Sequence, residues 1–409
     1  MAVGTGELPT MLPVKGFRLA TGCAGIKVAG RKDLVIMALA EGSEIATVFT
    51  RNAFCAAPVQ LAKHHLLAST GEKKIRYLLT NTGNANAGTG EQGLADAQQS
   101  CAALASIAGV DVTQVLPFST GVIGEPLPME PLLAGLPATF AMLNESEGGW
   151  ADAAEGIMTT DTRPKGASRQ IEINGETVTI TGIAKGAGMI RPDMATMLAY
   201  VATDAQCSSD YLQQVLNRAV NKSFNRITID GDTSTNDSLV LVATGQAGAV
   251  FRNDEDSAGF AEAVEQVCIE LAQAIVRDGE GATKFVSVKV TGGTSVEECL
   301  KVAYTVADSP LVKTALFASD PNWGRILAAI GRAGVADLDV HPIKVWLDDV
   351  LITEQGGRAT SYTEQAGQQV MDKDELTIRI DLARGDVSET VWTTDLSYDY
   401  IRINAEYRT

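Results

Sequence analysis

Short apolar runs of strand length alternate with longer amphipathic stretches along almost the whole sequence, and this alternation limits the fold more than any other feature. Leu34–Ala40, Val178–Ile183 and Leu239–Thr244 have the length and composition of buried strands. Ser208–Asn221 and Gly259–Val276 have apolar residues at helical spacing. Because 409 residues are too many for one ordinary core, we expect two or three lobes with an α/β or α+β architecture.

Further elements follow from the same patterns, and Asn174-Gly175 predicts a hairpin turn. Strands are expected at Ala46–Thr50, Ile75–Thr80, Val115–Phe118, Thr196–Ala202, Ile227–Asp230 and Phe285–Val290, and in a β-rich end from Ile343 to Thr393. Helices are expected at Leu94–Ile107, Trp150–Met158 and Val296–Asp308, and from Arg325 onward. Glu125–Pro137 is interpreted as a long loop, and Asn404 and Thr409 as parts of a tail.

The formal net charge of −17 argues against nucleic acid and anionic lipid as partners, because a polyanion repels both. No secretory leader is apparent, and no run of roughly 18 apolar residues predicts a membrane span. The six cysteines are scattered without a Cys-x-x-Cys pair. We therefore expect free thiols in a cytoplasmic protein.

Several kinds of catalytic site are improbable from the residues present. The three histidines, His64, His65 and His341, lie far from any nucleophile motif, which argues against a Ser-His-Asp triad or a histidine-ligated metal. The loop Asp230–Asp237 resembles a calcium loop but has Leu241 where a bidentate glutamate is needed. We predict no metal and interpret this loop as a self-bonded turn or a wall of the active site.

The segment from Gly182 to Leu198 is the most unusual part of the sequence, since a lysine, glycines and a proline precede Ala195-Thr196 at the start of an apolar run. Attack of the Thr196 hydroxyl on the Ala195 carbonyl would give an ester that water can hydrolyse, freeing the Thr196 α-amine. Such an amine has an ordinary pKa of about 7.7–8.0, so it can act as a base without any histidine. The residues alone also allow an ordinary buried strand threonine.

Nine short motifs, in order along the chain, together resemble the bifunctional glutamate N-acetyltransferase, or ornithine acetyltransferase, family of arginine biosynthesis. They are Asn81-Thr-Gly-Asn-Ala-Asn-Ala, Pro117-Phe-Ser-Thr-Gly-Val-Ile, Ile157-Met-Thr-Thr-Asp-Thr, Ala184-Lys-Gly-Ala-Gly-Met, Met194-Ala-Thr-Met-Leu, Asp230-Gly-Asp-Thr-Ser-Thr-Asn-Asp, Arg277-Asp-Gly-Glu-Gly-Ala-Thr-Lys, Ser319-Asp-Pro-Asn and Ile403-Asn-Ala-Glu-Tyr. The resemblance covers essentially the whole chain. It implies a two-lobed α/β sandwich that cleaves itself between Ala195 and Thr196.

The resemblance also assigns roles to individual residues. Thr196 corresponds to the family's nucleophile, and Thr120 and Gly121 to its oxyanion hole. The family's substrate-binding positions correspond to Thr159, Lys185, Thr196, Glu280, Asn404 and Thr409. A lysine can pair with a substrate carboxylate and a glutamate with a substrate ammonium. Without the resemblance, these charges would be interpreted as ordinary surface residues.

The activity that the resemblance implies is transfer of acetyl from N2-acetylornithine to glutamate through an acetyl-Thr196 intermediate. Cleavage would give an α-chain, residues 1–195, and a β-chain, residues 196–409, which assemble as a heterotetramer of two each. No cofactor is expected, although acetyl-CoA is a candidate second acetyl donor. One alternative is an N-terminal-nucleophile aminopeptidase or amide hydrolase, and another is an uncleaved protein that only binds small amino acids.

Overall fold

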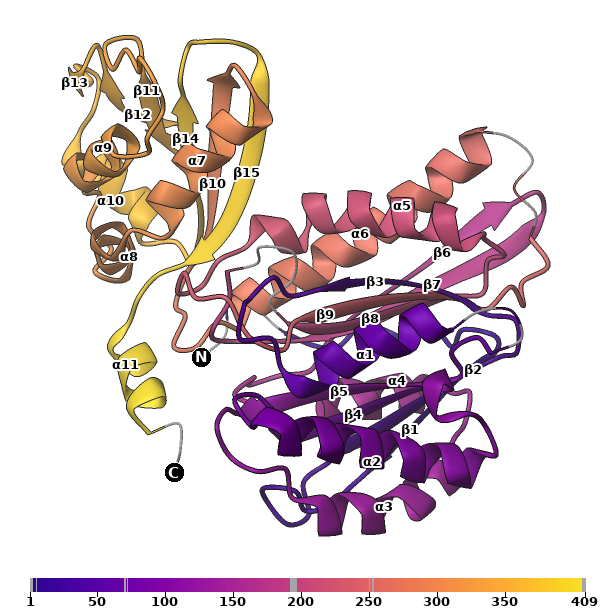
Figure 1. Cartoon of the computed structure of the whole chain (residues 1–409). Coiled ribbons are helices and arrows are strands. Elements are labelled where there is room, and N and C mark those ends of the chain that lie inside the picture. Colours follow the sequence, from indigo (N-terminus) through magenta and orange to yellow (C-terminus); the bar gives the residue numbers. More distant parts are fainter. Residues whose placement is uncertain are drawn as a thin grey trace.

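The computed structural model describes residues 3–4, 6–69, 71, 73–191, 197–249, 251 and 254–406. It has two lobes, as Figure 1 shows. The larger lobe contains two sheets stacked face to face, and helices cover the outer face of each sheet. The smaller lobe is built around a third sheet. This mixed α/β architecture, with a sandwich at its centre, agrees with the fold class predicted from the sequence.

The first sheet of the larger lobe has four strands in the order β1-β2-β4-β5. Every residue of β2 is buried, because other layers cover both faces of this strand. Leu34 and Ile36 pack toward α2 and α3, whereas Val35 and Met37 pack toward the second sheet, as the two-residue period of a strand requires. The elements are β1 (Phe17–Gly22), β2 (Leu34–Leu39), β4 (Tyr77–Asn84), β5 (Val115–Val122), α1 (Ala57–Ala68), α2 (Gly90–Ala108), a 3₁₀ turn (Val112–Gln114), α3 (Met129–Ala141) and α4 (Glu147–Gly156).

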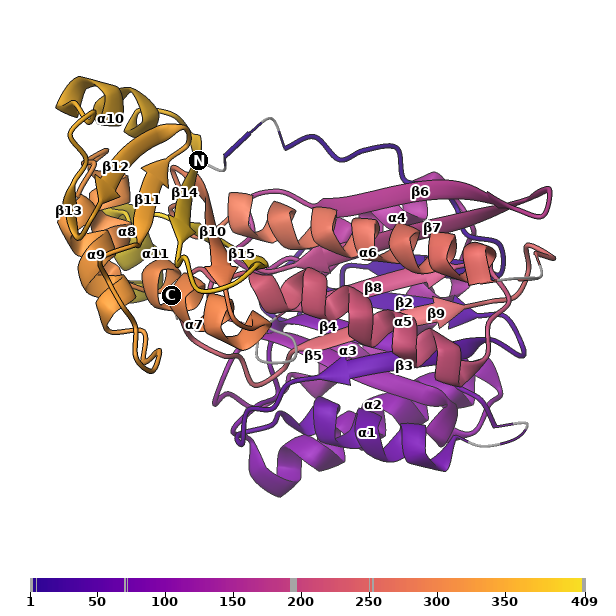
Figure 2. The same cartoon turned by 90° about the horizontal axis from the view of Figure 1, so that it is seen from above.

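The second sheet has five strands in the order β3-β9-β8-β7-β6, and α5 and α6 cover its outer face (Figure 2). Along β8, Ala199 and Val201 face these helices, whereas Leu198 and Tyr200 face the first sheet. The elements are β3 (Glu44–Phe49), β6 (Lys165–Ile173), β7 (Glu176–Lys185), β8 (Leu198–Thr203), β9 (Ser238–Ala243), α5 (Ser209–Lys222), a 3₁₀ turn (Phe224–Arg226) and α6 (Asp254–Arg277). The layers therefore run helix, sheet, sheet, helix.

The smaller lobe has a six-stranded sheet in the order β13-β12-β11-β14-β10-β15 with its own apolar core. Its elements are β10 (Phe285–Gly293), α7 (Val296–Ala307), α8 (Pro310–Phe317), α9 (Trp323–Gly331), β11 (Lys344–Leu347), β12 (Val350–Glu354), β13 (Gly357–Arg358), α10 (Glu364–Met371), β14 (Glu375–Asp381) and β15 (Val387–Thr394). A last helix, α11 (Tyr398–Ala405), leaves this lobe and lies beside the larger one (Figure 1).

Most predicted elements are confirmed, with shifted ends, and Ser208 caps α5 by accepting from the Tyr211 amide. The predicted strand Ile227–Asp230 is wrong, because Ile227 makes only an isolated bridge to Trp392. The predicted loop Glu125–Pro137 is also wrong, since much of it belongs to α3. Burial of one face of this helix, including Leu132 and Leu136, offsets the hydrogen bond that Pro137 cannot donate.

The position between residues 195 and 196 does not coincide with the division between the lobes. The strands β7 and β8, which come before and after this position, are antiparallel neighbours in the second sheet. The smaller lobe begins only after α6, at β10. Both of the expected polypeptides therefore contribute strands to the same sheet, while the division into residues 1–195 and 196–409 stays a prediction.

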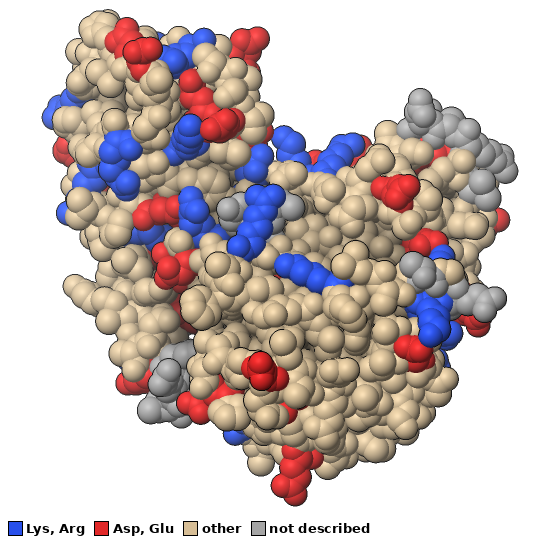
Figure 3. Space-filling model, in the orientation of Figure 1, with Lys and Arg blue, Asp and Glu red and all other residues tan. Residues whose placement is uncertain are grey.

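Charged side chains of both signs are interspersed on the face shown in Figure 3, and the region over α1 and α2 carries few of them. Within the described ranges, no helix combines the length and the apolar character that crossing a membrane requires. None of the six cysteines forms a disulfide, as expected from the sequence.

A buried lysine joins α8 to the end of β15 in the smaller lobe. The Nζ of Lys313 donates to the Thr393 hydroxyl at 2.9 Å and also to the Thr394 carbonyl. In return, the Lys313 carbonyl accepts from the Leu396 amide at 3.1 Å. Burial lowers the Lys313 pKa to about 8, although the Asp395, Asp308 and Asp230 carboxylates oppose the shift.

This lowered pKa predicts a pH dependence of stability. Between the native pKa of about 8 and the ordinary value of 10.5, the unfolded chain binds more protons at Lys313 than the native chain. Stability should therefore rise with pH in this window, by up to about 3 kcal/mol relative to Lys313→Met. Urea unfolding from pH 7 to 10.5 measures this difference, with the exposed Lys301→Met as control. Parallel curves for the wild type and Lys313→Met would refute the prediction.

Candidate active site

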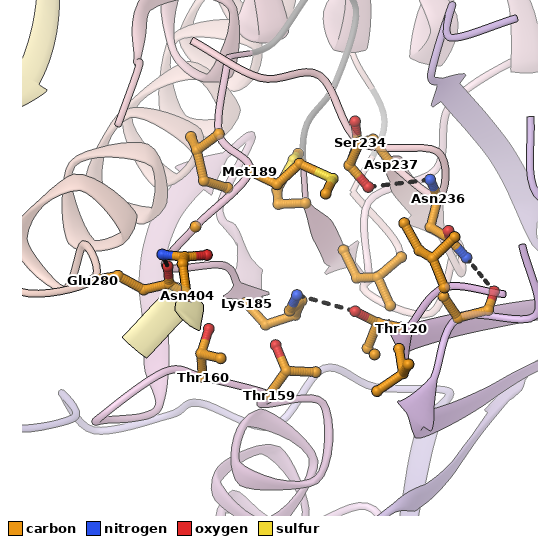
Figure 4. A pocket seen from close by; sticks show the side chains of 18 residues that line it. Thr120, Thr159, Thr160, Lys185, Met189, Ser234, Asn236, Asp237, Glu280 and Asn404 are labelled. Atoms are coloured by element: carbon orange, nitrogen blue, oxygen red, sulfur yellow. Dashed lines mark hydrogen bonds between the residues drawn. The ribbon is translucent and has the colours of Figure 1, made fainter. Parts of the chain in front are cut away.

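A cavity of about 290 Å³ lies where β5 and β7 end and β8 begins, with α11 at one side. The loops before β9 and after α6 complete its walls. All six predicted site residues in the described part of the chain line it, and most are labelled in Figure 4: Thr120, Gly121, Thr159, Lys185, Glu280 and Asn404. Met197, the residue after the predicted nucleophile, also lines this cavity.

Three predicted positions, Ala195, Thr196 and Thr409, lie outside the described residues. Around the first two, the structure describes the chain up to Arg191 and from Met197 onward. Arg191 lies at the end of the preceding segment, and the Met197 carbonyl accepts from the Ser238 amide at 2.8 Å as β8 begins.

Thr120 and Gly121 lie near the end of β5, beside the parallel strand β4. Gly121 has a φ of +139°, and a Cβ added there would lie 2.3 Å from the carbonyl carbon of Gly83 on β4. Only glycine fits this close approach of two backbones without displacement. The end of β5 thus places the Thr120 hydroxyl and the Gly121 backbone, with its positive φ, in the wall of the cavity.

Lys185 is the last residue of β7, and its Nζ donates to the Thr120 Oγ1 at 3.0 Å (Figure 4). Burial lowers the Lys185 pKa, and the nearby Asp161 and Asp237 carboxylates oppose this shift. Because the Thr120 oxygen accepts from the lysine, its own hydroxyl hydrogen is available for another acceptor. The pair can therefore present two donors, O–H and N–H, to negative charge in the cavity.

A buried ion triad lies directly behind this wall. The Lys165 Nζ is 2.5 Å from the Asp161 Oδ1 and 2.6 Å from the Asp278 Oδ2, and all three side chains are at most 1% exposed. Burial alone would raise the Asp161 pKa, but the Lys165 and Lys185 ammonium groups together with hydrogen bonds hold it well below its usual range. Asp161 therefore stays ionised.

The triad carboxylates also fix the backbone of the cavity wall. Asp161 accepts from the Thr159 amide at 2.9 Å and from the Gly186 amide, next to Lys185, at 2.7 Å. Asp278 accepts from the Thr162 amide at 3.0 Å. The residue motifs around Thr159 and Glu280 contain these aspartates, but the sequence analysis gave neither aspartate a role.

Two carboxylates also line the cavity, those of Glu280 and Asp237. Glu280 is 8% exposed, and its Oε2 accepts from the Asn404 Nδ2 of α11 at 2.7 Å (Figure 4). Its backbone amide donates to the Ala187 carbonyl at 2.8 Å. A Cβ at Gly188 would lie 2.4 Å from the Glu280 carboxylate, so a glycine is needed beside it. The cavity thus contains the Lys185 ammonium together with the Glu280 and Asp237 carboxylates.

The loop Asp230–Asp237 bonds to itself, as expected, because the Asp230 and Ser234 side chains accept from amides two residues further on. Its residues Ser234, Asn236 and Asp237 line another wall of the cavity. The Asn236 Nδ2 donates to the Ala85 carbonyl at 2.6 Å and to the Ser119 carbonyl at 2.9 Å. Asn236 thus ties this loop to the ends of β4 and β5, a structural role that the sequence analysis missed. Among the described residues, no group of three His, Cys, Asp or Glu side chains could hold a metal.

Comparison with known proteins decides the family. The model of the ArgJ family matches residues 18–409. The chain belongs to the ArgJ family. Two relatives named "Arginine biosynthesis bifunctional protein ArgJ", from Pseudomonas fluorescens (strain Pf0-1) and Pseudomonas syringae pv. tomato (strain ATCC BAA-871 / DC3000), are each 62% identical over 412 residues and are matched over their full length and that of this chain. The resemblance inferred from the nine motifs is thereby confirmed.

Two solved ArgJ-type structures are also similar to part of this chain. A Bacillus halodurans ArgJ crystal structure is 40% identical, covers 50% of this chain and 97% of its own, and has a TM-score of 0.48. A Mycobacterium tuberculosis ornithine acetyltransferase, described as complexed with ornithine, is 35% identical. It covers 45% of this chain and 94% of its own, with a TM-score of 0.39.

The triad yields a stability prediction for this ArgJ family member. Lys165→Met would leave two carboxylates buried side by side without a cation, at a cost of about 3–5 kcal/mol in the free energy of unfolding. Lys301→Met, which removes an exposed lysine paired with Glu297, should change it by less than about 1 kcal/mol. Urea unfolding followed by circular dichroism measures both. Equal effects of the two substitutions would show that the two carboxylates do not need the buried cation.

Proposed function

We propose that the chain transfers an acetyl group from N2-acetylornithine to glutamate through an acetyl ester of Thr196. As a member of the ArgJ family it is an acyltransferase of arginine biosynthesis. The observation that carries the proposal is one cavity lined by Lys185, Glu280, Thr120 and Met197, the residue next to Thr196. A cation, an anion and an oxyanion donor are the groups that transfer between amino acids requires.

Activation of the enzyme is proposed to be its own cleavage. The Thr196 hydroxyl attacks the Ala195 carbonyl, the C–N bond breaks, and the released amine takes the hydroxyl proton. Water then hydrolyses the resulting ester, leaving a carboxylate on Ala195 and the hydroxyl on Thr196. The products are an α-chain, residues 1–195, and a β-chain, residues 196–409, whose first residue carries both nucleophile and base.

Transfer then proceeds as a ping-pong cycle. The Thr196 α-amine accepts the hydroxyl proton as the oxygen attacks the acetyl carbonyl of acetylornithine. The Thr120 hydroxyl and the Gly121 N–H donate to the oxyanion that develops, an interaction strongest in the transition state. Ornithine leaves with that proton on its α-amine. The α-amine of glutamate then attacks the acetyl ester and regenerates the Thr196 hydroxyl.

The charges of the cavity suit amino-acid substrates. Lys185 pairs with a substrate carboxylate, and Glu280 with a substrate ammonium. Thr159 and Asn404 contribute neutral hydrogen bonds, and Thr409 is proposed as a further substrate contact. N2-acetylornithine offers a side-chain ammonium and a carboxylate to these two charges, whereas glutamate, whose single amine attacks the ester, offers only its carboxylates.

Further features of the proposal come from the family resemblance. Transfer needs no cofactor, and acetyl-CoA is the proposed second donor that would explain the word "bifunctional" in the names of the relatives. The two polypeptides are proposed to assemble as a heterotetramer of two each in the cytoplasm.

The alternative is an N-terminal-nucleophile hydrolase, which would share Thr196 and the cleavage. It would release ornithine from acetylornithine at the same rate with and without glutamate. Membership of the ArgJ family favours transfer instead.

Cleavage is tested by the intact mass under denaturing conditions. The wild type should give two fragments, the second beginning at Thr196, and Thr196→Ala one chain of 43.1 kDa. Thr196→Ser, which keeps a hydroxyl, should still be cleaved. A wild type that remains one chain, or a Thr196→Ala variant that is cut at this bond, would contradict the assignment of the nucleophile.

The oxyanion donor is tested by glutamate-dependent release of ornithine. Thr120→Ala should lower kcat/KM by about 10²–10³-fold, because one donor to the oxyanion is lost. Thr120→Ser keeps the hydroxyl and should stay within about tenfold of the wild type. Both variants are compared as fully cleaved enzyme. Similar activity of the alanine and serine variants would refute this role of the hydroxyl.

A further inference from the structure

The segment 186–191, which leads to the proposed cleavage bond, is held by a continuous series of hydrogen bonds. Its backbone takes part in six of them: at the Gly186 amide, the Ala187 carbonyl, the Met189 and Ile190 amides, and the Ile190 and Arg191 carbonyls. Five of the six partners belong to residues after position 196, and only Asp161 precedes it. The part of the chain before the bond is therefore held by the part after it.

Asp230 makes the most direct of these contacts. Its Oδ2 accepts from the Met189 amide at 2.6 Å, and its Oδ1 accepts from the Ile190 amide at 2.9 Å. The Ile229 amide donates to the Ile190 carbonyl at 2.7 Å. The Tyr400 hydroxyl of α11 also donates to Asp230, at 3.2 Å. A carboxylate that accepts from two successive amides fixes which residues of the segment lie beside it, because these hydrogen bonds are directional. Burial of the Ile190 side chain is not directional and would not fix this register alone.

A second carboxylate holds the next residue. The Arg191 Nε donates to the Asp308 Oδ2 at 2.8 Å, while the Thr228 hydroxyl donates to the Asp308 Oδ1 at 2.6 Å. The guanidinium also lies over the Tyr304 ring, 5.0 Å from its centre. The Arg191 carbonyl accepts from the Thr233 hydroxyl at 3.0 Å. Asp308 comes directly after α7 of the smaller lobe, so this contact joins the segment to that lobe.

Both ends of the stretch that contains the cleavage bond are thus anchored. Arg191 is fixed before it, and Met197 is fixed after it by its hydrogen bond to Ser238. Five residues, 192–196, connect these anchors. An acyl shift requires the attacking oxygen about 3–3.5 Å from the carbonyl carbon and in line with it, so restraint at both ends raises the fraction of chains in a reactive geometry.

We propose that Asp230 and Asp308 are positioning residues for self-cleavage: they clamp residues 189–191 so that the Ala195–Thr196 bond is presented for attack. The inference rests on the proposed function, since it assumes cleavage at this bond. It also follows that the clamp retains the α-chain end after cleavage, because the clamped residues lie four to six positions before that end. Neither carboxylate takes part in the bond making or breaking itself.

The test follows cleavage of the full chain after cell-free synthesis, by pulse–chase and loss of the 43.1 kDa precursor. Asp230→Asn and Asp308→Asn should each slow cleavage about 10-fold or more. Asp232→Asn is the matched control: Asp232 is exposed and makes no side-chain hydrogen bond to residues 186–191 within the described chain. It should cleave at the wild-type rate.

A coupling measurement separates positioning from simple destabilisation. Arg191→Met should slow cleavage about as much as Asp308→Asn. A variant with both substitutions should be no slower than the slower of the two single variants, because the two side chains act as one pair. In uncleaved Thr196→Ala protein, Asp230→Asn should speed hydrogen exchange of the Met189 and Ile190 amides. Amides within β8 should keep their protection, which shows that the variant is folded.

The outcomes distinguish this inference from the proposed function. If the wild type is not cleaved, the proposed function fails. If the wild type is cleaved and both aspartate variants match its rate, or if Asp230→Asn leaves exchange at Met189 and Ile190 unchanged, the clamp is refuted. Additive slowing in the double variant would refute the pairing of Arg191 with Asp308.

Discussion

The ammonium of Lys165, buried between Asp161 and Asp278, is the interaction on which the pocket depends. It joins three segments: the loop after α4, the start of β6 and the turn after α6. The carboxylates also accept hydrogen bonds from backbone amides and from the Thr162 hydroxyl, so each buried charge has several polar partners. Such a triad contributes less to net stability than to geometry, because the same segments in any other arrangement would leave a charge buried alone.

The second sheet explains how a chain could be cut at its active site and remain one molecule. β7 and β8 pair along six residues across the sequence position of the proposed cut. The helices α5 and α6 then cover strands from both sides of that position. Breaking one peptide bond removes none of these hydrogen bonds or apolar contacts. The covalent link between the two polypeptides is lost, while the hydrogen bonds and packing that hold them together stay.

The sequence predicts local elements well where a single pattern dominates. β2 and α5 were predicted because burial on both faces, or on one stripe, leaves a clear period. α3 was not, because Pro137 weighs against a helix locally and only the packing of Leu132 and Leu136 outweighs it.

In the site, too, some residues could be predicted from the sequence and others could not. The lining residues were predicted from motifs shared with a family, and those within the described ranges do meet in one cavity. The ion triad was not predicted, since Lys165 and Asp278 are separated by 113 positions and nothing in the local sequence pairs them. Asn236 was missed for the same reason: its partners on β5 and after β4 are more than a hundred positions away.

The opposite charges of the cavity belong to different parts of the architecture. Lys185 ends a strand of the larger lobe, whereas Glu280 lies on the turn that leads into the smaller lobe and is held by Asn404 on that lobe's last helix. α11 buries none of its own residues, so few apolar contacts fix it in place. An amino acid bound to both charges would link the two lobes through its carboxylate and its ammonium. Bound substrate would then oppose separation of the lobes, and the resistance of the enzyme to proteases would rise with the concentration of its own substrates.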